Sequence, residues 1–177
     1  MEKPTSIKHY VVPALVTAAL FVLCCLFLPF DTSNVTELTD RIGFAKICYL
    51  FISSFSIIMG IFATGHSRGN SNAHDSVNGG TEDVVGIPNR NFRNTTEQFL
   101  LHAVAMLTLT LFLEGSSMKV TPILSGIFLL SRILSQVGHA HLHSPIFIEF
   151  GFASSVIPTL TVYMYCLVCI ITKILSV

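Results

Sequence analysis

A run of charged and amide side chains at residues 90–98 (RNFRNTTEQ) leads directly into an apolar segment. On a helix, Arg90, Asn94 and Glu97 follow an i, i+4, i+7 pattern and fall within a sector of about 60°. Arg93 flanks that face. A guanidinium offers a two-pronged donor for a carboxylate, and a carboxylate holds an ammonium group. The four side chains therefore predict a binding site for a zwitterionic ligand.

The same four residues have a second interpretation as anchors at a membrane surface. Long basic side chains near the end of a membrane helix commonly extend toward the interface. Glu97 would then pair with an Arg and hold helices together. Spacing alone does not separate a ligand site from a set of anchors.

Two more polar residues are candidates for catalysis. Arg132 is the one cation well inside an apolar run, so we expect it to face the bundle interior and to find a partner there. Glu97 and Glu149 are the candidate partners, and the alternative is that Arg132 extends to the nearby membrane surface. His139 can donate a hydrogen bond or act as a base. The sequence alone does not identify a catalytic residue. Arg132 and His139 are the two candidates for that role.

The remaining histidines and cysteines predict no metal site and no disulfide. The histidines at 139, 141 and 143 share a face only in an extended strand, and a zinc site needs a closed set of ligands. His102 projects about 120° from the face of Arg90, so we expect it to hydrogen-bond between helices. The five cysteines lie inside apolar runs, where Cys packs as a small hydrophobe.

Membrane helices must position these residues. Of the 177 residues, 51% are hydrophobic and 11% are charged, and the mean hydropathy is +0.69. Soluble domains carry about 25% charged residues. Every backbone amide in lipid is hydrogen-bonded within its own element, so the apolar runs predict helices. The predicted helices span approximately residues 11–29, 43–64, 90–114, 119–138 and 147–173.

Composition also excludes several classes of protein. Ten basic and ten acidic residues balance, which excludes nucleic-acid binding through net positive charge. The high apolar content excludes a disordered chain and a coiled coil. The run at 11–29 follows Lys3 and Lys8 as a signal peptide would, but its length and the lack of a small-residue cleavage site favour a retained helix.

The whole chain, residues 1–177, is expected to form a single membrane domain. Residues 65–89 are rich in Gly, Ser, Asn and Asp and predict a flexible loop. The distribution of Lys and Arg favours a cytoplasmic N-terminus, a cytoplasmic 65–89 loop and a lumenal C-terminus.

The motif Arg-x-x-Arg-Asn-x-x-Glu, which begins at Arg90, resembles the signature of the MAPEG superfamily, membrane-associated proteins in eicosanoid and glutathione metabolism. The resemblance covers roughly residues 45–175. It implies an all-α integral membrane protein, a four-helix bundle that assembles as a homotrimer, with one extra N-terminal membrane helix. It also implies glutathione as a ligand, bound at Arg90, Asn94 and Glu97.

The catalytic part of the family pattern is degraded. An Arg at the start of the final helix holds the thiolate in the catalytic members, and alignment on Pro145 puts Phe147 there. Arg132 matches an Arg of the preceding helix, but Ser135 and His139 stand where an aromatic residue or His and a Tyr are expected. Without the cation, electrostatic stabilisation of a thiolate is lost. The resemblance therefore implies that the glutathione-binding residues are retained while the catalytic residues are not.

The five-helix layout, with PILSGIFLLSR at residues 122–132, resembles the mattrin-like branch, which is associated with endomembrane and secretory trafficking. We therefore predict a multi-pass protein of endoplasmic reticulum, Golgi, endosome or lysosome, with a vestigial or regulatory glutathione pocket. The alternative is a glutathione-dependent transferase or peroxidase that acts on lipophilic electrophiles from the bilayer.

Overall fold

The computed structural model describes residues 8–70, 82–139 and 144–176, and every regular element within these ranges is helical. The elements are α1 (Lys8–Phe27), α2 (Leu38–Ala45), the π-helical segment η1 (Lys46–Ile52), α3 (Ser53–Gly69), α4 (Glu82–Leu109), the 3₁₀ segment η3 (Gly115–Lys119), α5 (Val120–Val137) and α6 (Pro145–Leu175).

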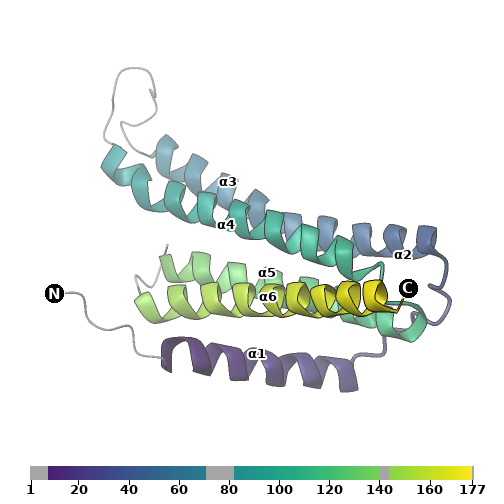
Figure 1. Cartoon of the computed structure of the whole chain (residues 1–177). Helices are drawn as coiled ribbons and strands as arrows, with labels where there is room; N and C mark the ends of the chain where they lie inside the picture. Colours follow the sequence, from purple (N-terminus) through teal and green to yellow (C-terminus); the bar gives the residue numbers. More distant parts are fainter. Residues whose placement is uncertain (1–7, 71–81, 140–143, 177) are drawn as a thin grey trace.

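The helices form an elongated bundle (Figure 1). α2, η1 and α3 follow one another without a break, and α4 packs antiparallel to them. α5 and α6 form a second antiparallel pair, and α1 packs along that pair. The chain is therefore a four-helix bundle with an added N-terminal helix, as the sequence predicts.

Four helical segments within the described ranges are long and apolar enough to cross a membrane. They are Tyr10–Phe27, Leu38–Gly69, Gly115–Val137 and Pro145–Leu175. The predicted span at 90–114 is different, because α4 is long enough but its first half is polar. One face of this polar half is buried against the bundle through Asn91 and Thr95, while Arg90 and Arg93 are exposed.

The helix ends differ most from the prediction around the 65–89 segment. α3 continues to Gly69 and α4 begins at Glu82, so much of the expected loop is helical. Pro88 consequently lies inside α4 rather than at its start. Packing between antiparallel partners offsets the low helix propensity of Gly and Asn here. Residues 71–81 lie outside the described part of the chain.

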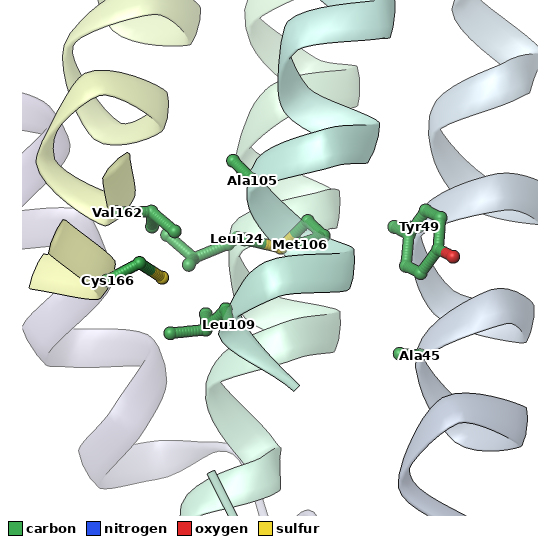
Figure 2. Packing of buried hydrophobic residues seen from close by; sticks show 8 residues of the cluster. All are labelled: Ala45, Tyr49, Ala105, Met106, Leu109, Leu124, Val162 and Cys166. Carbon is green, nitrogen blue, oxygen red and sulfur yellow. The ribbon is translucent and has the colours of Figure 1, made fainter. Parts of the chain in front are cut away.

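The apolar core occupies the half of the bundle where α4 ends (Figure 2). It joins α2, η1, α4, α5 and α6 through side chains that are at most 8% exposed. These are Ala45, Tyr49, Ala105, Met106, Leu109, Leu124, Val162 and Cys166. The other half of the bundle interior is lined by polar side chains.

Candidate polar ligand site

α4 carries a buried polar stripe along its middle, from Asn91 to His102. Asn91, Thr95, Gln98 and His102 follow an i, i+4, i+7, i+11 pattern, and each is at most 7% exposed. This spacing places them on one helix face. Because that face is turned inward, their polar groups need partners on α5 and α6.

Arg132 on α5 is fully buried beside this stripe, at 0% exposure. Its Nη1 donates to Oε1 of Gln98 at 2.8 Å and lies 3.4 Å from the Ser155 hydroxyl oxygen. Its Nη2 donates to Oγ1 of Thr95 at 2.9 Å. Neutral oxygens from α4 and α6 thus surround the guanidinium, which is held in the middle of three helices.

The prediction that Arg132 faces the bundle interior and finds partners there is confirmed, but the two carboxylates named as its partners and the alternative of a surface position are wrong. Arg132 does not extend to the membrane surface, because it is fully buried. It does not pair with Glu97 or Glu149, since its hydrogen bonds go to hydroxyl and amide oxygens. Glu97 faces outward and accepts a hydrogen bond from Nε of Arg93 at 3.0 Å, with both side chains more than half exposed. The next residue, Gln98, is turned by about 100° around α4 and therefore faces inward.

A polar cavity of about 250 Å³ lies where α4 and α6 begin and α5 ends. It brings together three of the predicted site residues: Arg90, Asn94 and His139. Its other lining residues are Tyr10, Asn91, Ile148, Glu149 and Phe152. Arg93, Glu97 and Arg132 do not line it.

A hydrogen-bond relay connects this cavity with the buried arginine. Nε2 of Gln98 donates to Oδ1 of Asn94 at 3.3 Å, while Oε1 of Gln98 accepts from Arg132. An Asn amide has one oxygen and two N–H donors. The oxygen of Asn94 accepts this bond, so the groups that Asn94 can offer to a ligand are its N–H donors. Arg132 therefore positions a cavity residue without lining the cavity itself.

His139 presents one ring nitrogen to the cavity as an acceptor. Its Nδ1 lies 2.9 Å from the carbonyl oxygen of Ser135. A carbonyl only accepts, so Nδ1 carries a proton in this hydrogen bond, and in the neutral tautomer that this favours Nε2 is the acceptor.

The charges of the cavity suit a zwitterion. Arg90 and the amide of Asn94 supply donors for a carboxylate, and Glu149 supplies an acceptor for an ammonium group. Glu149, and not Glu97, is the acidic residue that lines this cavity.

The position aligned with the thiolate-binding arginine adds no cation. Phe147 packs against the end of α5, where a Cβ atom on Gly138 would come within 2.9 Å of its Cβ. Phe147 does not line the cavity, and its neighbour Glu149 brings a negative charge instead.

No group of three potential metal ligands forms among the residues the structure describes. His141 and His143 lie outside that part of the chain. The prediction for His102 is confirmed, since its Nδ1 lies 3.3 Å from Oγ1 of Thr159 on α6. Its ring also stacks on Phe128 of α5, with centroids 4.3 Å apart.

Sequence reasoning missed the partners of Arg132, which are Thr95, Gln98 and Ser155. A signal was present, because polar residues recur every three or four positions from Asn91 to His102, within and beyond the charged motif.

Comparison with known proteins gives a family match and two related proteins. The model of the MAPEG family matches residues 43–168. The chain is similar to Transmembrane protein 79 of Mus musculus, at 26% identity over 159 residues, and of Bos taurus, at 27% over 158 residues. These matches cover 87% and 86% of the chain but 40% and 39% of the relatives. The chain thus spans about two fifths of the length of these relatives. No solved structure matches.

Proposed function

The chain belongs to the MAPEG family, and we propose that it is a glutathione-binding, non-catalytic member that acts in endomembrane organisation. Glutathione binding is proposed because Arg90, Asn94 and Glu149 line the same cavity. Glutathione has two carboxylates and one ammonium group, and these are the groups that this set of side chains complements.

The absence of catalysis follows from the charges around the cavity. Among the described residues that line the cavity, Arg90 is the one Lys or Arg, and a ligand carboxylate occupies it. The second charged lining residue, Glu149, is a carboxylate, which raises the pKa of a nearby thiol. Bound glutathione therefore stays a thiol, and the ligand regulates or stabilises the bundle.

We further propose that the protein assembles as a homotrimer. Ligand pockets commonly have volumes of about 300–1,000 Å³, so the 250 Å³ cavity of one subunit is small for a tripeptide. A neighbouring subunit would enlarge it. The exposed Arg93–Glu97 pair on the adjacent face of α4 is available to such a neighbour. Light scattering on the detergent-solubilised protein tests this, and a monomeric mass contradicts it.

Calorimetric titration of the purified full chain with glutathione tests the binding site. We expect binding at millimolar concentration or below, and a loss of at least tenfold in affinity for Arg90→Ala, a cost of about 1.4 kcal/mol. Lys173→Ala is the matched control, because this exposed cation lies at the other end of the bundle. No heat from the wild-type protein at millimolar glutathione contradicts the proposal.

A glutathione-dependent transferase or peroxidase is the second candidate, and His139 favours it. Its Nε2 is an acceptor in the same cavity, where it can take the thiol proton. An assay with an aromatic chloride as electrophile separates the candidates. We expect binding without conjugation. Conjugation that His139→Ala abolishes would establish the transferase instead.

The endomembrane assignment rests on the resemblance to the mattrin-like branch and has its own test. A tagged full chain is expected in the endoplasmic reticulum, Golgi, endosomes or lysosomes, with a cytoplasmic N-terminus. Fluorescence microscopy and protease protection of an N-terminal tag measure both. Plasma-membrane labelling or a lumenal tag contradicts this part.

A further inference from the structure

A second and larger cavity lies toward the other end of the bundle. It has a volume of about 640 Å³ and is bounded by α1, α5, α6 and η3. One wall consists of Ala14, Thr17, Ala18 and Phe21, which share a face of α1 at i, i+3, i+4, i+7 spacing. α1 precedes residues 43–168, the range that matches the family model, so this cavity is an addition to the family bundle.

The opposite walls of the cavity are apolar core side chains. Leu109, Leu124 and Val162, which Figure 2 shows at the centre of the bundle, line it together with Ile127 and Pro158. From Val120 to Ile127, α5 rises about 10 Å along the cavity. An apolar wall of this length suits part of a hydrocarbon chain, and the rest of a longer chain would fold within the cavity or pass out of it.

Polar groups gather at one end of this cavity. Ser116, Ser117 and Lys119 line it from η3, at the end of the bundle where α5 begins. Nζ of Lys119 lies 3.3 Å from the carbonyl oxygen of Cys25. That carbonyl belongs to the last turn of α1, where helix carbonyls lack partners within the helix. Lys119 thus holds α1 in place with one of its three N–H donors.

Two donors of this ammonium group remain, and its charge has no counter-ion in the described part of the chain. The ion pair found there is Arg93–Glu97, at the opposite half of the bundle. A partly buried cation at the edge of an apolar cavity favours an anion. A ligand with a single negative charge and an apolar chain would match the cavity. Its charge would pair with the ammonium group of Lys119, and its chain would contact the apolar walls.

We propose that this cavity binds a long-chain fatty acid, with its carboxylate at Lys119 and its chain between α1 and the α5–α6 pair. The volume lies within the range of about 300–1,000 Å³ that holds small ligands. The anionic headgroup distinguishes this ligand from neutral lipids, which would use the apolar walls but not the ammonium group. The fatty acid fills the space beneath α1 and stabilises the packing of that helix.

The test compares palmitate with hexadecanol, which has the same chain but no charge, on the purified full chain in a non-ionic detergent. Native mass spectrometry gives the affinities, and thermal unfolding gives the stabilisation. We expect palmitate to bind at least tenfold more tightly than hexadecanol. Lys119→Gln should abolish this preference while hexadecanol still binds, and Lys119→Arg should retain it. Equal affinities of the wild-type protein for both lipids overturn the proposal.

A second pair of variants tests the location without removing the contact between Lys119 and α1. Ala18→Phe fills the cavity and should abolish binding of both lipids, whereas Ala19→Phe, at the next residue, which does not line the cavity, should not. Palmitate binding that is unchanged in Ala18→Phe contradicts the assignment. Glutathione affinity should be the same in both variants, so failure here and failure of the polar site remain distinguishable.

Discussion

Arg90 and Arg132 are the same residue type in the same half of the bundle, but they have opposite environments. Arg90 is exposed and lines a cavity, where it can meet a ligand. Arg132 is fully buried, and its guanidinium donates to side chains of α4. The difference shows that burial among neutral oxygen acceptors leaves the guanidinium of Arg132 engaged within the bundle, whereas that of Arg90 stays accessible.

The energetics explain why the two arginines cannot exchange roles. Burial of a guanidinium costs several kcal/mol unless hydrogen bonds and nearby dipoles compensate for it. Thr95, Gln98 and Ser155 provide this compensation, which fixes α4 against α5 and α6. Arg90 keeps its solvation and its donors. We therefore expect Arg132 to control stability and Arg90 to control binding.

The largest expected effect is the loss of the buried arginine. Arg132→Ala leaves a cavity and unpaired oxygens, and we expect a destabilisation of about 3 kcal/mol. Denaturant unfolding in detergent measures it, with Arg90→Ala as the matched control at nearly wild-type stability. The folded fraction of Arg132→Ala should retain glutathione affinity within about threefold, because Arg132 acts on Asn94 only through Gln98. Equal stabilities of Arg132→Ala and Arg90→Ala would contradict the proposed difference between a structural and an accessible arginine.

The helix crossing that holds Arg132 next to Ser155 gives the second effect. A Cβ atom on Gly151 would lie 2.5 Å from the carbonyl oxygen of Ser131, so Gly151→Ala forces α5 and α6 apart. We expect a loss of about 2 kcal/mol in thermal unfolding. Gly126→Ala, which meets nothing within 4 Å, is the control and should be neutral or slightly stabilising. A harmless Gly151→Ala would show that the crossing is loose.

The chemistry of Arg90 itself gives a smaller and purely functional effect. Arg90→Lys keeps the charge but loses the planar fork for a carboxylate. We expect it to recover only part of the roughly tenfold affinity, about 1.4 kcal/mol, that Arg90→Ala loses. Calorimetry measures both variants. Full recovery by Lys would indicate a purely electrostatic contact.

The smallest effect belongs to the exposed pair. Glu97→Gln removes an i, i+4 ion pair with Arg93 and should cost about 0.3 kcal/mol in stability. The same variant also tests whether Glu97 contacts a ligand that is bound to a neighbouring copy of the chain. Weaker glutathione binding at unchanged stability would show that Glu97 reaches the ligand from a neighbouring subunit.

Sequence reasoning located the helices and the polar face of α4 because both depend on local periodicity. It grouped Arg90 with Asn94, and these two residues line the same cavity, since residues four apart share a helix face. It did not find the partners of Arg132, because it sought carboxylates and the structure supplies neutral oxygens. Which face of α4 turns inward is set by packing with α5 and α6, and no local pattern specifies it.

The two cavities also differ in how far the sequence predicts them. The polar cavity contains motif residues and was partly predictable. The apolar cavity is formed by ordinary hydrophobic and small residues of α1, α5 and α6, which no motif marks. Its existence depends on how α1 packs, which is a tertiary property.

The most direct test of binding without thiol activation is a pH titration of bound glutathione, followed by the ultraviolet absorbance of the thiolate. Arg132 is buried, and among the described residues Arg90 is the sole Lys or Arg lining the cavity, beside the carboxylate of Glu149. We therefore predict that the thiol pKa of bound glutathione equals or exceeds that of free glutathione. A thiol pKa that falls on binding would contradict a non-catalytic site and establish a cation at the sulfur.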